Sequence, residues 1–259
     1  KIPLGILNPE QLQALAEVAE RFTPKKIGHI TTRQDMQLHE IKRSEIPELL
    51  RVLAQADLTT REACGNTVRN VTACPYAGIS SQETFNVTPY AEAVVQYFLR
   101  NPLNQNLPRK FKIAFEGCIT DHARTPIHDL GLVAAVQEEN GKMKKGFRVY
   151  VGGGLGPFPR VALLLEPFTS AEMLLPTAEA IVRIFDRLGE RRDRNRARIK
   201  FLAEKLGPEE FRKTIFAERN AVLSTRSGLA LIEVEDYEET PPPAGAKGKA
   251  SSNDAEFEH

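Results

Sequence analysis

Apolar residues near the start of the chain recur at the spacing of an amphipathic helix. Leu12, Leu15 and Val18 follow Asn8 and Pro9, a pair typical of a helix start, because Asn can cap the first turn and Pro suits the first helical position. This pattern predicts a helix over residues 9–22.

Alternating and β-branched residues follow this helix. Residues 26–32 and 36–41 surround a short polar turn, which favours two strands or one bent strand pair. A second helix is expected to start at Ser44 as its N-cap, with Ile46 and Leu53 on its apolar face. We interpret this region as a small βαββα unit, which resembles half of a ferredoxin-like sandwich.

The remainder of the chain alternates between loops, strands and helices. A polar, glycine-bearing loop region at 59–78 precedes a helix at 89–100, and Asn140-Gly141 predicts a tight hairpin. The other expected elements are strands at 111–115, 130–137 and 146–151, a helix from Thr169 or Ser170 through residue 188, a basic helix at 193–206 and a short helix from residue 207.

These patterns place the chain in the α+β class and divide it into three parts. We expect a ferredoxin-like half domain at residues 1–57 and an α/β domain at 58–230. Residues 231–259 contain three consecutive prolines and more acidic than basic side chains, which is typical of a flexible linker.

Composition narrows the classes of function. The 259 residues include 35 Lys and Arg against 34 Asp and Glu, a formal charge of +1, which argues against a broadly basic nucleic-acid binder. Three cysteines cannot form a disulfide framework, and with no apolar signal segment they indicate a reducing compartment such as the cytoplasm. They also fall one short of a four-thiolate iron–sulfur site, and no apolar run reaches the roughly 20 residues of a membrane span.

Candidate chemistry is concentrated in a few motifs. In the first motif, Arg33 lies at the turn, and strand alternation places Gln37 and His39 on one face, although an exposed strand face explains that pair equally well. The second motif contains Cys64 and Cys74 at a separation that matches no compact zinc spacing. Structural thiols are therefore the favoured interpretation of these two cysteines.

The third motif enters an apolar strand. Alternation places Lys110 and Lys112 on one face with Phe111 opposite, an arrangement that is favourable when an anion lies between the two charges. Surface solvation is the alternative explanation. A fourth motif, the glycine run at 152–154, allows backbone to approach an anionic ligand, although its spacing is neither that of a dinucleotide fingerprint nor that of a P-loop.

A further basic stretch, residues 183–205, has nine basic and four acidic residues. Most are expected to form a solvated helix face, while one or two arginines can meet ligand carboxylates because the guanidinium group is bidentate. His122 and His128 lie near Asp121 and Asp129, but no ligand spacing supports a metal or acid/base role for them.

Taken in order, the motifs resemble those of the sulfite and nitrite reductase family that uses sirohaem coupled to a four-iron cluster. The matching segments are Thr-Thr-Arg-Gln-x-x-Gln-x-His at 31–39, Cys-Gly-x-x-x-Arg-Asn at 64–70, Arg-Lys-Phe-Lys at 109–112 and Val-Gly-Gly-Gly-Leu at 151–155. The basic segment at 191–200 is similar too. The shared order extends over most of the chain, so the resemblance makes residues 58–230 a sirohaem-binding domain.

This resemblance implies a role for each motif. Arg69, Lys110 and Lys112 would face the distal side of the iron, where cations bind the anion, polarise its oxygens and relay protons during six-electron reduction of sulfite to sulfide or nitrite to ammonia. Ferredoxin or another reductant would donate the electrons. The residues that would contact the sirohaem are Thr31, Arg33, Gln37, His39, Asn66, Arg109, Gly152, Gly153 and Gly154.

The resemblance also implies parts that this sequence does not supply. In the family, the cluster cysteines come in two pairs in the later half of the protein, and Cys64, Cys74 and Cys118 lack that spacing. A further anion-binding arginine usually lies just before the position of Lys1. We therefore expect an N-terminal half that is inactive alone and works with a C-terminal half carrying the cluster ligands.

Two other functions fit parts of the same pattern. The chain can instead be a non-catalytic subunit or binding module for an anionic tetrapyrrole or a partner, in which case the native protein ends near residue 259. RNA binding is disfavoured, because aromatic residues make up 7% of the chain and Trp is absent, which leaves few stacking platforms.

Overall fold

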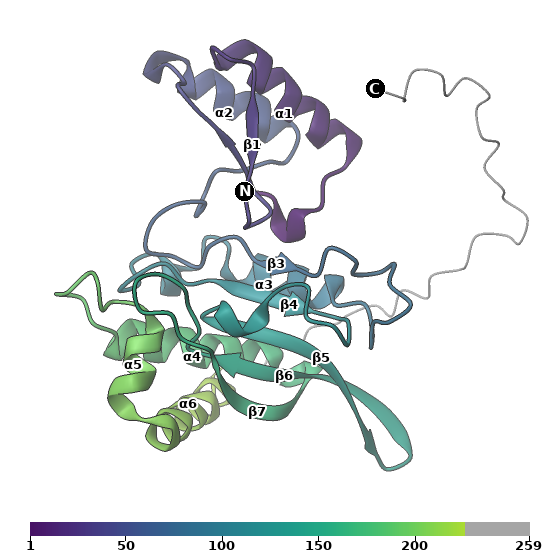
Figure 1. Cartoon of the computed structure of the whole chain (residues 1–259), viewed down its shortest axis with the longest axis vertical. Helices are drawn as coiled ribbons and strands as arrows, with labels where there is room; N and C mark the ends of the chain where they lie inside the picture. The colour runs from purple at the N-terminus through teal and green to yellow at the C-terminus, as the bar shows by residue number, and fades with distance from the viewer. Residues whose placement is uncertain (226–259) are drawn as a thin grey trace, which may run out of the picture.

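The computed structural model describes residues 1–225, which form a small N-terminal unit beside a larger unit of sheet and helices (Figure 1). The linker expected at 231–259 lies outside the described residues. Within the described part, no helix is long and apolar enough to cross a membrane. Two hydrophobic cores, one in each unit, confirm an α+β architecture.

The N-terminal unit packs two helices against a two-stranded hairpin. Helix α1 (Pro9–Phe22) starts at a capping box, in which the Asn8 side chain accepts from the amide of Gln11 at 2.8 Å. Strands β1 (Gly28–Ile30) and β2 (Met36–Leu38) pair antiparallel, and helix α2 follows at Ile46–Gln55. Their shared core consists of Ile2, Leu15, Val18, Phe22, Leu49, Leu53 and Leu58.

Two details of this unit differ from the sequence-based expectation. Pro3–Gly5 form a 3-10 turn, and within residues 1–225 no strand precedes α1, so the order is αββα rather than βαββα. Ser44 does not cap α2, because it lies inside a second 3-10 turn at Arg43–Glu45. An N-cap at Ser44 would use the amide of residue 46 or 47, and Pro47 has no N–H to donate, which removes one of the two donors.

The larger unit is built on a five-stranded mixed sheet in the order β3-β4-β5-β6-β7. Strands β3 (Thr72–Ala73), β4 (Ile113–Glu116) and β5 (Leu130–Glu139) are parallel neighbours. Strands β6 (Lys142–Val151) and β7 (Leu163–Ser170) continue the sheet antiparallel. The predicted hairpin joins β5 to β6, and both Asn140 and Gly141 have positive φ, as a tight two-residue turn requires.

Four helices complete this unit and share its core. They are α3 (Thr88–Phe98), α4 (Leu174–Leu188), α5 (Ile199–Leu206) and α6 (Pro208–Leu223). The largest fully buried side chains in this core are aromatic: Phe98, Phe111, Phe115, Phe147, Phe185 and Phe211. Loops of this unit, together with the turn at Arg33 of the N-terminal unit, form the candidate site.

Strand β7 was not predicted from the sequence, and Thr169 and Ser170 end it rather than start a helix. The buried Thr169 hydroxyl donates to Glu166, so polar side chains occupy positions where an alternating strand would be apolar. Pro167 further obscures the pattern, and it is tolerated because β7 is an edge strand. The following helix α4 therefore starts only at Leu174.

The basic helix expected at 193–206 is also shorter than predicted. Asp193 folds its own segment into a turn by accepting from the backbone amides of Asn195 and Arg196, and regular helix begins at Ile199. In contrast, the helix expected to be short after Gly207 runs for 16 residues as α6.

The turn between β1 and β2 is docked on the larger unit. The Gln34 side chain pairs with the backbone of Ala73 in both directions, donating at 2.8 Å and accepting at 3.1 Å, in the manner of an added strand residue. The buried Asn70 amide donates to the carbonyls of Ile2 and Arg33. These bonds hold Arg33 over the sheet, close to the start of β4.

Candidate functional site

Basic residues from four separate parts of the sequence converge beside the start of β4. Positive charge on Arg33, Lys110 and Arg198 acts on Lys112, and Lys110 lies within the electrostatic influence of Arg69 as well. As strand alternation predicts, Phe111 is fully buried while its two lysine neighbours are only partly covered.

Two cavities open on either side of Leu155. One, of about 490 Å³, is lined by the basic residues Arg109, Lys110, Arg194, Arg198 and Lys200. The other, of about 440 Å³, is lined by Arg33, Lys112, Arg124, His122 and His128 among other residues. Among residues 1–225, no Asp or Glu lines either cavity, which is the electrostatics of a site for an anionic ligand.

The charged forms of the lysines in this cluster are destabilised by burial and by neighbouring positive charges. Burial, and then the positive charges of Arg33, Arg198 and Lys110, lower the pKa of Lys112 to about 8. Burial and neighbouring arginines lower the pKa values of Lys110 and Arg109 as well. A bound anion would relieve this repulsion, so the cluster is matched to a negatively charged ligand.

Arg33 is held by a dense set of acceptors. Its guanidinium donates to the carbonyls of Asn70 at 2.5 Å and Ile113 at 3.1 Å, and to the Thr72 hydroxyl at 3.1 Å. Burial lowers the pKa of Arg33 to about 10. Within the described residues its buried Nε atom has no hydrogen-bond partner, which leaves one donor for a ligand.

His128 lies next to Arg33 in the neutral state. Its Nδ1 donates to the Arg124 carbonyl at 2.8 Å, and its Nε2 accepts from the Arg33 guanidinium at 2.5 Å. These partners assign the tautomer. Burial, followed by the charge of Arg33, lowers the pKa of His128 to about 4.

This pKa predicts a pH dependence of folding stability. Between pH 6.5 and 4 the imidazole is neutral in the folded chain but protonated in the unfolded chain, so the stability contribution is intact above pH 6.5 and falls as pH drops towards 4. Between pH 7.5 and 4.5 the wild-type chain should lose about 2–3 kcal/mol more unfolding free energy than His128→Gln does, measured by urea titration. Equal losses in the two proteins would contradict the assigned imidazole state.

Asp129 is the buried counter-charge of the basic cluster and bonds to two parts of it. Its buried carboxylate accepts a bidentate pair from Arg198 at 3.0 and 2.8 Å and the backbone amide of Lys112 at 2.8 Å. Burial raises the pKa of Asp129, while Arg198 acts in the opposite direction. Arg198, which belongs to the basic stretch at 183–205, therefore has a carboxylate partner within the chain.

The glycine run has an internal packing role. A Cβ atom on Gly153 would lie 2.2 Å from the Pro126 carbonyl oxygen, and Gly152 has a φ of +87°. Gly154 faces the stem of Lys200, whose nearly buried ammonium donates to the carbonyls of Leu155 and Phe158. The run thus lets the end of β6 pack against the loop before β5.

Other predicted site residues lie outside the two cavities. The Thr31 hydroxyl accepts from the amides of Arg33 and Asp35 and so stabilises their turn. Gln37 and His39 are exposed on the β2 side of the hairpin, and Asn66 is exposed in the loop that follows Cys64. The structure groups Arg33, Arg69, Arg109, Lys110, Lys112 and Gly154 and does not bring Thr31, Gln37, His39 or Asn66 into that group.

Arg69 is positioned by its own loop. Its guanidinium donates to the carbonyls of Gly65 and Ala63, both at 2.9 Å. Its backbone amide donates to the Phe111 carbonyl, which ties this loop to the Lys110 and Lys112 segment. The sequence did not single out His128, Asp129 or Lys200 as parts of this site; their positions depend on contacts that no local spacing reveals.

Comparison with known proteins places these features in context. A family model described as the nitrite/sulfite reductase ferredoxin-like half domain matches residues 1–56, and one described as the nitrite and sulphite reductase 4Fe-4S domain matches residues 64–222. The chain is 35% identical over 225 residues to the assimilatory ferredoxin-dependent nitrite reductase of Haloferax mediterranei, covering 83% of this chain and 38% of that protein.

Further relatives show the same partial coverage. Sulfite reductase [ferredoxin] 1 of Mycolicibacterium paratuberculosis is 33% identical over 212 residues, which cover 82% of this chain and 37% of that protein. The solved structure of the Mycobacterium tuberculosis NirA protein has a TM-score of 0.77 and 30% identity, covering 85% of this chain and 39% of that one. The chain thus spans about two fifths of the length of these relatives.

Proposed function

The chain belongs to the nitrite and sulphite reductase family, and from this premise we propose that it supplies the anion-binding and sirohaem-binding part of a six-electron nitrite or sulfite reductase. The two acid-free, cation-lined cavities carry this proposal. Both substrates are anions, and cationic donors preorganised in a partly buried site bind such anions and stabilise the charge that develops on their oxygens.

The residues present fit a tetrapyrrole with eight carboxylates. Arg109 lines one of the two cavities that share Leu155 and Arg33 lines the other, so Arg109 and the orphaned Nε of Arg33 offer donors to different carboxylates. When bound, the sirohaem and its coupled four-iron cluster supply the redox chemistry. Residues 1–57 and 58–230 are the proposed domains, the first presenting Arg33 to the second.

This chain's own residues are proposed to bind the substrate anion and to supply a proton. Arg69, Lys110 and Lys112 are proposed to bind the substrate anion and polarise its oxygens. Lys112 is suited to hold a transferable proton on Nζ, because its pKa of about 8 lies near neutral pH. The three cysteines are too few for a four-thiolate cluster, so the cluster ligands are proposed to come from sequence outside this chain.

The electron donor and the cellular compartment are also proposals. The Haloferax relative is described as ferredoxin-dependent, which supports ferredoxin as the proposed electron donor. Cys64, Cys74 and Cys118 are free thiols, which supports a reducing compartment such as the cytoplasm.

Reconstitution tests the proposal. The complete protein, including the segment that carries the cluster ligands, is loaded with sirohaem and assayed with reduced ferredoxin or a reduced viologen. We expect a bound-tetrapyrrole absorption spectrum and conversion of nitrite to ammonium or sulfite to sulfide. A folded protein that binds the tetrapyrrole without turnover would support a binding module instead, and one that binds no tetrapyrrole would overturn the whole proposal.

A further inference from the structure

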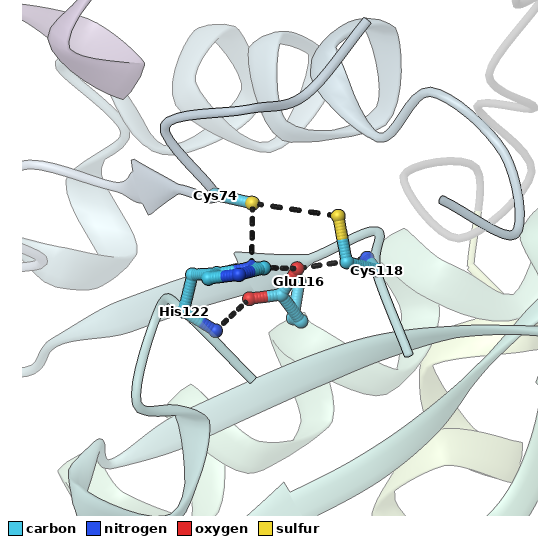
Figure 2. A group of neighbouring side chains, drawn as sticks. All are labelled: Cys74, Glu116, Cys118 and His122. Atoms are coloured by element: carbon cyan, nitrogen blue, oxygen red, sulfur yellow. Dashed lines mark hydrogen bonds and ion pairs between the residues drawn. The ribbon is translucent and has the colours of Figure 1, made fainter. Parts of the chain in front are cut away.

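A second group of side chains lies beside the cation cluster and has no part in the proposed reduction. The Cys2HisGlu group consists of Cys74 after β3, Glu116 at the end of β4, Cys118 just beyond it, and His122 in the following loop (Figure 2). Strands β3 and β4 are parallel neighbours, so their carboxyl ends meet at one edge of the sheet. We propose that this group binds one divalent transition-metal ion of the zinc class in a tetrahedral site.

The separations between the ligand atoms match such an ion. With metal–sulfur bonds of about 2.3 Å and metal–nitrogen bonds of about 2.0 Å, a tetrahedron has a sulfur–sulfur edge of about 3.8 Å and a sulfur–nitrogen edge of about 3.5 Å. The Sγ atoms of Cys74 and Cys118 are 3.8 Å apart, and the Cys74 Sγ is 3.5 Å from the Nδ1 of His122. The fourth ligand atom needs only a small adjustment, because Glu116 Oε1 lies 3.8 Å from that nitrogen.

Glu116 is prepared as a ligand by the backbone around it. Its Oε2 accepts from the amides of His122 and Ala123, and its Oε1 accepts from the amide of Cys118 at 2.8 Å, so these backbone donors orient the carboxylate towards the other three ligand groups. The carboxylate is fully buried, and within residues 1–225 its one ion-pair partner is the His122 imidazole. A buried carboxylate with so little positive charge around it favours a bound cation.

The donor set selects the kind of ion. Two thiol sulfurs and an imidazole favour zinc over the oxygen-preferring Mg²⁺ and Ca²⁺, and two sulfurs are too few for a four-iron cluster. Binding replaces each S–H bond by a metal–sulfur bond and releases two protons to solvent, with no change in oxidation state. His122 is 30% exposed, which provides an entry path.

The position of the group indicates what the ion would do. It would connect the ends of β3 and β4 to the loop that carries Arg124 and His128 into the 440 Å³ cavity. Because His122 itself lines that cavity, the ion would fix part of the wall of the candidate anion site.

Metal titration of the reduced, metal-free 259-residue chain tests this inference in the absence of tetrapyrrole, so its outcome is separate from that of the reductase proposal. With Co²⁺ as the probe, we expect intense visible bands of a tetrahedral complex and near-ultraviolet thiolate charge transfer, saturating at one ion per chain and displaced by Zn²⁺. Cys118→Ser and His122→Ala should each weaken Zn²⁺ binding about 100-fold or more. Cys64→Ser is the matched control, because Cys64 is exposed and outside the group, and it should bind as the wild type does.

Three results would overturn the inference: no saturation at one ion per chain, an equal loss of affinity in Cys64→Ser, or a weak octahedral Co²⁺ spectrum. Reduced chain that binds no metal but reoxidises to a Cys74–Cys118 disulfide would assign the pair a redox role instead. If Cys118→Ser does not fold, as judged by circular dichroism, the partly exposed His122→Ala variant decides.

Discussion

In the complete protein loaded with sirohaem and its cluster, the Lys112→Met variant is expected to lose about 100- to 1,000-fold in kcat/KM for nitrite or sulfite. Lys112 shares its cavity with Arg33 and lies next to Lys110 on the strand face, so its removal takes away a positive donor where the anion is proposed to bind. It also removes the group with a pKa of about 8, which can pass a proton to the departing oxygen. Steady-state rates of donor oxidation measure the loss.

Charge and proton transfer can be separated at this position. Lys112→Arg restores a permanent charge that does not release its proton near neutral pH, so KM should recover more than kcat. Wild-type kcat/KM should fall as pH rises above about 8, where Lys112 loses its proton, and the arginine variant should lack that limb.

A surface lysine provides the control. Lys142 is exposed at the start of β6, and Lys142→Met should leave the rate constants unchanged. If Lys112→Met retained wild-type kcat/KM, or if both methionine variants lost the same activity, Lys112 would have no specific role in the reaction.

The parts of the fold that the sequence predicts are those with local signals. The capping box of α1 and the Asn140-Gly141 turn each lie within a few residues, and both elements form where expected. Strand β7 depends instead on Arg219, which binds Glu166 from 53 residues away and makes a polar strand position favourable. No short window of sequence contains that contact.

In the candidate site, too, local sequence predicts some features, while others depend on contacts between distant residues. Alternation around Phe111 predicts one face for Lys110 and Lys112, and the structure confirms that arrangement. The Cys2HisGlu group escapes a search for compact metal spacing, because Cys74 is 44 residues from Cys118 and only the parallel pairing of β3 with β4 brings them together.

The second large effect is expected on folding stability, when the buried carboxylate of Asp129 is removed. Asp129→Ala is expected to lower the unfolding free energy of the chain by about 3–5 kcal/mol in a denaturant titration at pH 7. The change would strand the Arg198 guanidinium, whose side chain is only 13% exposed, and would leave the Lys112 amide without its acceptor. Arg198 would then face the like charges of Arg33 and Lys112 with no counter-charge.

The unpaired charge, rather than the loss of a favourable contact alone, should account for most of this effect. Adding Arg198→Met to Asp129→Ala removes the stranded guanidinium, so the double variant should be more stable than Asp129→Ala by itself. An exposed Arg–carboxylate pair serves as the control: Glu209 contacts Arg212 at 2.8 Å but is 89% exposed, and Glu209→Ala should leave the unfolding midpoint nearly unchanged. If the double variant were no more stable than Asp129→Ala, the penalty would come from the lost Lys112 contact and the packing of the loop. The Asp129–Arg198 pair would then contribute little to holding the cation cluster together.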